Sequence, residues 1–202
     1  SELPKAREAK TSEEDKREAR VSTTDPEARV MKMGDGGFRP AYNVQLATDT
    51  QTRVIVGVDV TNSGSDQGQM PPMLEEIRER NGRLPAEHLV DGGYTKKESL
   101  EQASSQGVTV YAPVQKPRKE GVDPHQPKPG DSPAVAEWRQ RMGTPEAKEI
   151  YKERAATAER TNADLRSYRG LGPFLVRTLP KVRCVVLWAA LTYNILHLMA
   201  AM

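Results

Sequence analysis

The spacing of apolar and polar residues changes period along the middle of the chain. Residues 42–47 alternate between the two kinds, residues 49–52 are polar, and residues 54–60 form a nearly continuous β-branched run. Two such runs joined by a short polar turn predict a β-hairpin. Residues 70–80 carry apolar side chains at helical spacing, with prolines in the first turn and Asn81-Gly82 at the end. This segment is therefore predicted to be an amphipathic helix.

The next segments continue as strand, helix and strand. Residues 88–90 and 108–114 have strand-like composition, and residues 96–106 between them have a helical pattern that ends at Gly107. Strands that alternate with helices are typical of an α/β domain with at least some parallel pairing. The predicted fold class is therefore α/β.

The two ends of the chain differ from this middle. Residues 1–24 hold almost no large apolar side chains, which predicts a flexible charged tail or a solvated helix. Residues 25–202 are expected to form the globular part, and the proline-rich residues 115–134 a loop or insertion within it. From Ala136 onward the pattern is helical, with one helix expected from Thr144 to Tyr168 and a last one from Leu179 to Met202.

The last helix is unusually apolar. Residues 184–202 approach the roughly 20 apolar residues that a membrane span needs. However, Asn194 near the centre is costly in lipid, and Leu187, Leu191, Ile195 and Leu198 recur at helical spacing. We therefore expect a helix buried in protein and no membrane association.

Charge is distributed unevenly along the 202 residues. The 30 Lys and Arg residues and 28 Asp and Glu residues give a net charge of +2, which alone says nothing of nucleic acid. Residues 115–183, however, carry fifteen basic and nine acidic side chains, whereas residues 31–114 carry eight and eleven. A polyanion is therefore expected to bind the C-terminal third. A single cysteine excludes a disulfide framework and a cysteine-based zinc site, and with no secretory signal at the start the expected location is the cytoplasm.

The first candidate for chemistry is Asp91, which follows a predicted strand and precedes Gly92-Gly93-Tyr94. Ligands of open α/β sheets bind at the carboxyl ends of strands, and the two glycines allow a ligand to approach closely. An ordinary Asp-Gly turn is the commoner explanation of this pattern. Both interpretations stay open at this point.

The second candidate is a set of polar residues on the long helix: Tyr151, Arg154, Glu159 and Arg166. At about 100° per residue, all four directions fall within about 140°. Glu159 could bind a metal ion, and the two guanidinium groups could bind phosphates as bidentate donors. Judged by spacing alone, a solvated helix face is the simpler interpretation.

Several segments together resemble the C-terminal part of insertion-sequence transposases of the DDE class, in the bacterial branch with a long insertion after the first strand. They are residues 25–31 (DPEARVM), residues 41–45 (AYNVQ) and residues 91–94 (DGGY). The helix adds a pattern similar to the Tyr-Arg-Glu-Lys motif of these enzymes. Two departures stand out: four residues rather than three separate Arg154 from Glu159, and Arg166 replaces the usual lysine.

The resemblance implies a ribonuclease-H-like mixed sheet flanked by helices, in which three carboxylates hold two Mg²⁺ ions, or Mn²⁺ in their place. It also implies cleavage of transposon ends and strand transfer on double-stranded DNA by a nucleoid-associated protein that forms homo-oligomers. Asp91 and Glu159 would be two of the catalytic, metal-binding carboxylates, and Tyr151, Arg154 and Arg166 would contact DNA.

The first carboxylate of this family ends a strand upstream of the insertion, and nothing before Asp25 here has the pattern of such a strand. The sequence is therefore expected to lack the first strand of the sheet and to be catalytically incomplete, since two carboxylates hold a metal pair poorly. The alternative is a non-catalytic remnant that binds DNA or oligomerises.

Overall fold

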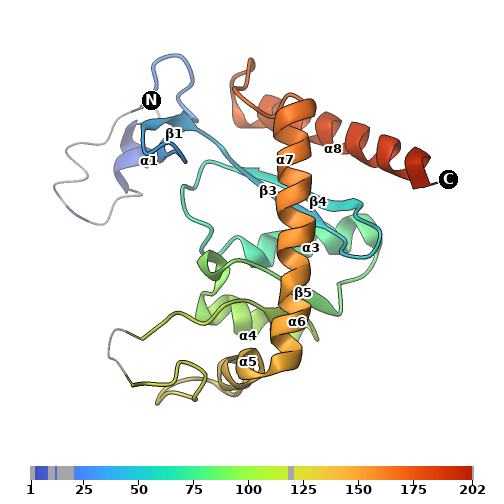
Figure 1. The fold of residues 1–202 in the computed structure, drawn as a ribbon. Coiled ribbons are helices and arrows are strands. Elements are labelled where there is room, and N and C mark those ends of the chain that lie inside the picture. Colours follow the sequence, from blue (N-terminus) through green and yellow to red (C-terminus); the bar gives the residue numbers. More distant parts are fainter. Residues whose placement is uncertain (1–2, 9–11, 13–20, 118–120, 202) are drawn as a thin grey trace. The chain divides into compact units, whose positions relative to one another are not determined.

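The computed structural model describes residues 3–8, 12, 21–117 and 121–201, and its helices and strands are drawn in Figure 1. The chain divides into two compact units. The first comprises Ser1–Gln45, Val58–Ser65 and Leu165–Met202, and the second comprises Leu46–Gly57 and Asp66–Asp164.

The first unit contains a short helix and an antiparallel strand pair. Helix α1 spans Leu3–Glu8, and strands β1 (Arg29–Lys32) and β2 (Phe38–Ala41) pair with Arg29 opposite Ala41. Most of the predicted charged tail lies outside the described residues. The described part of this tail includes the helix α1.

Two acidic residues of the first unit stabilise the start of the last helix, α8 (Leu179–Ala201). The carboxylate of Asp25 accepts hydrogen bonds from the Tyr42 hydroxyl at 2.9 Å and from the Thr178 backbone N–H at 3.3 Å. The Glu27 carboxylate accepts one from the Leu179 N–H at 2.6 Å. Backbone N–H groups at a helix start lack partners within the helix, so these carboxylates satisfy two of the donors there. In residues 25–31, Asp25 and Glu27 thus have a structural role.

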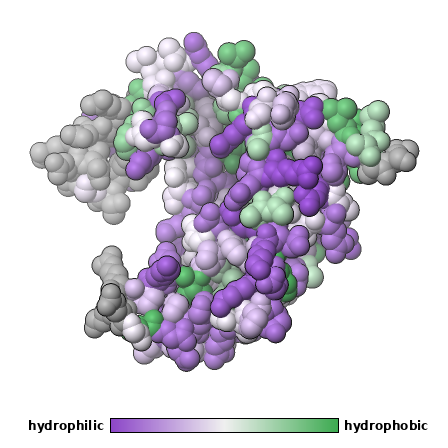
Figure 2. Space-filling view, in the orientation of Figure 1, coloured by the Kyte–Doolittle hydropathy of each residue, from purple (hydrophilic) through white to green (hydrophobic). Residues whose placement is uncertain are grey.

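Helix α8 is less buried than predicted. Less than a third of its most apolar window is buried, and its large exposed apolar side chains are Trp188, Leu191, Ile195, Leu196, Leu198 and Met199. They contribute to the green surface over the end of α8 in Figure 2. The prediction of a buried helix is therefore wrong for this surface. Within the described residues, α8 is the one helix long and apolar enough to cross a membrane, a test that core helices of soluble proteins also pass.

The predicted hairpin is confirmed. Strand β3 (Asn43–Thr48) is hydrogen-bonded to β4 (Ile55–Thr61), and the backbone N–H of Asp49 donates to the Val54 carbonyl at 2.9 Å to close the turn. The Asp49 carboxylate fixes the turn further, because Oδ1 accepts from the Thr52 backbone N–H at 2.6 Å and from the Thr52 hydroxyl at 2.7 Å. Such Asp-centred turns hold the chain in one geometry.

The second unit contains the predicted alternation of helices and strands. In order these are α3 (Met70–Asn81), β5 (Glu87–Leu89), the 3-10 turn η1 (Gly92–Tyr94), α4 (Lys97–Ser105), β6 (Thr109–Tyr111) and α5 (Pro133–Gly143). β5 and β6 are parallel, as expected, with His88 opposite Val110. The mixed α/β class is therefore confirmed, although the described strands form three two-stranded sheets.

The core of this unit lies between the β5–β6 pair and helices α3, α4 and α5. Its largest fully buried side chains are Met70, Leu74 and Val135, and Trp138 donates its indole N–H to the Ala112 carbonyl at 3.2 Å. Burial of these apolar side chains, at about 25 cal/mol per Å², is the main stabilising contribution to the unit.

The proline-rich segment is attached to α5 by a buried ion pair. The Asp131 carboxylate contacts Arg139 Nε at 2.7 Å and Lys97 Nζ at 2.9 Å, and it accepts a hydrogen bond from the Lys128 N–H. Burial by itself raises the pKa of Asp131, but hydrogen bonds from these groups outweigh it and hold the pKa well below its ordinary value.

One helix differs from its prediction. Instead of a single α-helix from Thr144 to Tyr168, the chain forms α6 (Pro145–Arg154), a π-helical turn η2 (Ala155–Glu159) and α7 (Arg160–Tyr168). A π turn contains one more residue than an α turn and is uncommon in proteins. It lies between the arginine and the glutamate of the predicted motif.

Candidate active site

Asp91 is positioned by the end of β5. The backbone N–H of Val90 donates to the Tyr111 carbonyl, which extends the contact with β6, and the chain then turns into η1. Asp91 precedes that turn in extended conformation, and its Oδ1 accepts the Gly93 N–H at 3.3 Å. The carboxylate therefore lies at the carboxyl end of a parallel strand, where the sequence predicted it.

The two glycines after Asp91 lie close to other parts of the chain. A Cβ at Gly92 would lie 3.4 Å from Pro113 Cγ, and a Cβ at Gly93 would lie 3.6 Å from Asp66 Oδ2. The Asp66 carboxylate is thus a close neighbour of the Asp91 turn. Nothing in the local sequence pattern around Asp66 marks this contact.

Helix α6 brings two more of the predicted residues to Asp91. The helix begins at Thr144, whose hydroxyl accepts the Ala147 N–H at 3.2 Å, and Pro145 occupies its first position. At its other end, Arg154 Nη2 lies 3.2 Å from Asp91 Oδ2. This ion pair joins residues 63 positions apart in the sequence.

Tyr151 belongs to the same group. It is partly buried against the core of the unit. Burial and the Asp91 charge raise the pKa of the Tyr151 hydroxyl, while the Arg154 charge and its hydrogen bond lower it, and the net change is upward. The hydroxyl therefore keeps its proton at neutral pH and can donate a hydrogen bond. Asp91, Tyr151 and Arg154 form one cluster, which we call the Asp91 cluster.

The other two predicted residues lie further along the same stretch of chain. Glu159 is exposed at the end of η2, and its carboxylate has no hydrogen-bond or ion-pair partner among the described residues. Arg166 is exposed in α7, in the segment that belongs to the first compact unit, whereas the Asp91 cluster belongs to the second.

Comparison with protein families gives one match. The family described as the transposase DDE domain matches residues 8–195. The chain belongs to this family. No curated protein and no solved structure matches it.

Membership confirms the resemblance to DDE-class transposases and associates the chain with DNA transposition. The family acts on DNA and typically uses a divalent metal ion. Carboxylate oxygens such as those of Asp91 and Glu159 are hard ligands that suit Mg²⁺, which also binds through waters and substrate phosphates. Among the described residues, no group of three or more His, Cys, Asp or Glu side chains is arranged to hold a metal ion.

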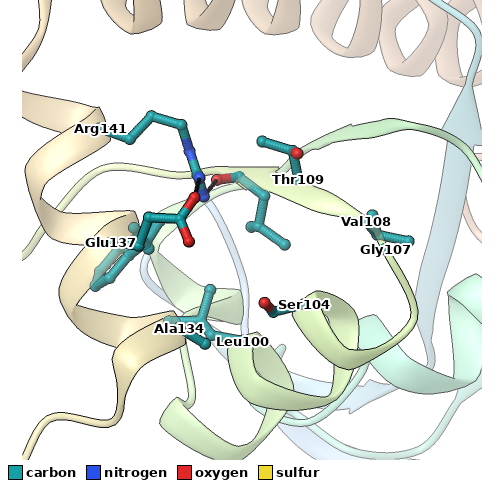
Figure 3. Close-up of a pocket in the computed structure, with 10 residues that line it drawn as sticks. Leu100, Ser104, Gly107, Val108, Thr109, Ala134, Glu137 and Arg141 are labelled. Atoms are coloured by element: carbon teal, nitrogen blue, oxygen red, sulfur yellow. Dashed lines mark hydrogen bonds and ion pairs between the residues drawn. The ribbon is translucent and has the colours of Figure 1, made fainter.

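A small cavity elsewhere in the second unit is a separate feature of this transposase domain. It has a volume of about 140 Å³ and lies between α4, β6 and α5, as Figure 3 shows. In its wall, Arg141 pairs with Glu137 at 2.9 Å and donates to the Val110 carbonyl at 3.2 Å. None of the predicted site residues lines it.

Proposed function

We propose that this chain takes part in DNA transposition by metal-dependent phosphoryl transfer, that is, transposon-end cleavage and strand transfer. In this proposal, Asp91 and Glu159 are metal-binding, catalytic carboxylates, and Tyr151, Arg154 and Arg166 contact DNA. The observation that carries it is the contact between an exposed strand-end carboxylate and the arginine of the helix motif. A ribonuclease-H-like fold, known for this chemistry, is part of the same proposal.

A divalent ion held by Asp91 and Glu159 would supply activation of the attacking oxygen and stabilisation of the leaving oxygen. The chemistry of the donors supports this, because both side chains are exposed carboxylates and carboxylate oxygens are the ligands that Mg²⁺ prefers. The pair between Asp91 and Arg154 is no obstacle: exposed ion pairs contribute at most about 1 kcal/mol, so Asp91 can exchange its partner.

The remaining residues would act on the DNA backbone. The Arg154 guanidinium has a planar set of donors that matches a phosphate, and it can pass from Asp91 to a phosphate as DNA arrives. The Tyr151 hydroxyl, protonated at neutral pH, can donate to a phosphate oxygen beside it. Both side chains would fix the DNA strand relative to Asp91, which is the positioning that phosphoryl transfer requires.

We further propose that the described residues form an incomplete site. Two carboxylates hold a metal pair poorly, and the first carboxylate of the family has no assigned counterpart here. Partners would be double-stranded DNA, at both transposon ends and target, and further copies of the chain. The net positive charge of residues 115–183 supports DNA as the partner, and the corresponding location is the bacterial cytoplasm, at the nucleoid.

DNA binding tests the proposed contacts. Replacement of Arg154 by Gln (Arg154→Gln) should weaken binding to a mixed-sequence duplex about tenfold and make the slope of log K against log salt less steep by about one, because one phosphate contact is lost. Fluorescence anisotropy over a salt series measures both quantities.

The matched control is Arg78→Gln, since Arg78 is an exposed arginine of the same unit that pairs with Glu75 on its own helix. An equal loss in both variants would contradict a specific role for Arg154. Plasmid nicking in Mg²⁺ then separates an enzyme from a non-catalytic remnant. The 202-residue chain alone should not nick DNA, and nicking that Glu159→Gln abolishes would show that the site is complete.

A further inference from the structure

The π turn η2 has two side-chain contacts to its backbone that the predicted motif does not explain. Arg53 Nη1 donates to the Ala156 carbonyl at 3.1 Å, and the Thr161 hydroxyl donates to the Thr157 carbonyl at 3.0 Å. Where a π turn returns to α-helical hydrogen bonding, one carbonyl is passed over, because backbone N–H groups pair with residues five and then four positions back. The Thr157 carbonyl also accepts the backbone N–H of Arg160, whereas the Arg53 guanidinium brings a donor to the Ala156 carbonyl from outside the helix.

The extra residue of the π turn changes the direction of Glu159. In a regular α-helix, a residue five positions after Arg154 points about 140° away from it, whereas a residue four positions after points only about 40° away. Because a π turn accommodates one added residue, Glu159 points approximately as a residue four positions after Arg154 would, only about 40° away from it. The turn thus offsets the four-residue gap between Arg154 and Glu159, one longer than the usual three.

Arg53 is well placed to hold this turn. It lies in the β3–β4 turn, which the Asp49 carboxylate fixes, and its own backbone N–H donates to the Asp49 carbonyl at 2.9 Å. Its φ angle is 59°, in the left-handed region that costs a residue with a side chain about 1 kcal/mol or more. A strained backbone that presents a long donor to a specific carbonyl is a feature that function can require.

The inner side of η2 is consistent with a turn that has one fixed orientation. Thr157 and Thr161 are both buried, whereas Glu159 is exposed. Since the buried threonines face the protein, rotation of the turn about its axis would bury Glu159 or expose them. The burial of these two threonines is therefore compatible with only one exposed side of the turn, the side that carries Glu159.

From these observations we infer that Arg53 is a positioning residue: it stabilises the π turn Ala155–Glu159 and thereby directs the Glu159 carboxylate to the side of the helix that carries Tyr151 and Arg154. The structural part rests on the contacts above, and the consequence for the metal ion rests on the proposed function. Arg53 itself touches neither metal nor DNA in this account.

Amide hydrogen exchange measured by NMR tests the structural part. Arg53→Ala should speed exchange of the amides of residues 159–161 about tenfold while leaving the Leu74 amide in α3 unchanged. Arg53→Gly should produce the same local effect even though glycine relieves the backbone strain, which separates loss of the donor from a change in the turn. Arg78→Ala, which also removes an exposed arginine of this unit, should change the exchange rate of none of these amides.

Deletion of Ala156 supplies the decisive comparison. The deletion restores a three-residue gap and an uninterrupted α-helix, so Arg53→Ala should then have no further effect on local exchange. An unchanged exchange rate in Arg53→Ala, or the same tenfold effect in the deletion background, would overturn the inference. If the deletion variant does not fold, the comparison of Arg53→Ala and Arg53→Gly with Arg78→Ala still decides it.

The functional part has its own readout, the gain in DNA affinity on addition of Mn²⁺. Arg53→Ala should reduce that gain several-fold, and deletion of Ala156 together with Arg53→Ala should restore it. If the unaltered chain gains no affinity from Mn²⁺, the proposed function fails, while the exchange comparison still tests the role of Arg53. Faster exchange without a reduced gain would overturn the positioning of Glu159.

Discussion

Two Asp–Arg pairs in the second unit have the same chemistry and opposite surroundings. Asp131 and Arg139 approach to 2.7 Å with 1% and 10% of their side chains exposed. Asp91 and Arg154 approach to only 3.2 Å, with 58% and 25% exposed. The Asp131 carboxylate also contacts Lys97 Nζ and accepts a hydrogen bond from a backbone N–H. The Asp91 carboxylate accepts one from the Gly93 N–H at 3.3 Å.

The comparison shows how surroundings decide what an ion pair can do. A buried, ion-paired carboxylate cannot exchange its partners without leaving a charge in a poorly solvated place, so Asp131 serves to hold the loop against α5. An exposed pair is stabilised weakly and can open to admit a metal ion or a phosphate. We therefore expect Asp131 to contribute to stability, whereas the Asp91 carboxylate is accessible for the function proposed above.

Breaking the buried pair should have the largest effect on stability. Asp131→Asn leaves Arg139 buried without its counter-charge, so the free energy of unfolding should fall by about 4 kcal/mol. Denaturant unfolding followed by circular dichroism measures the change.

The exposed pair provides the control for this experiment. Asp91→Asn should change the free energy of unfolding by less than about 0.5 kcal/mol, as is usual for an exposed ion pair. If the two variants lost similar stability, the contrast between a structural and an accessible pair would be wrong.

As the pH is lowered, the stability contributions of His88 and of Asp131 should be lost in different pH ranges. Burial lowers the pKa of His88, in the strand that leads to Asp91, from 6.5 to about 4. The unfolded chain therefore binds a proton more readily than the folded one, so stability falls as pH drops from about 6.5 to about 4, by up to about 3 kcal/mol. The pKa of Asp131 is lowered, so its contribution is present above its ordinary pKa and is lost only as pH falls below about 4.

Urea unfolding from pH 7 to pH 3 measures both effects. His88→Asn should remove the loss between pH 6.5 and 4 and leave the loss at lower pH. A slope in the upper range that persists in His88→Asn would assign it to another group.

Local patterns predicted the elements that depend on local physics. Alternation over residues 42–60 identified the hairpin, and the proline and glycine at the ends of residues 70–82 identified α3. The spacing from Tyr151 to Arg154 and the position of Asp91 after a strand were enough to name the residues that the fold brings together.

Contacts between distant residues could not be predicted in this way. The single added residue before Glu159 is visible in the sequence, but the π turn and its contact with Arg53, 103 residues away, are not. The neighbourhood of Asp66 and Gly93 and the exposure of α8 likewise depend on how segments pack, which side-chain periodicity does not record.

The central claim is that Asp91 and Glu159 together bind a divalent ion beside DNA. The most direct test is the affinity of the chain for a duplex, measured by anisotropy with and without Mn²⁺, in the unaltered chain and in Asp91→Asn/Glu159→Gln. Glu149→Gln is the control, since Glu149 is an exposed carboxylate that pairs with Lys152 on the same helix. The account predicts a gain of about tenfold from Mn²⁺ in the unaltered chain and the control and none in the double variant, whereas an equal gain in all three would contradict it.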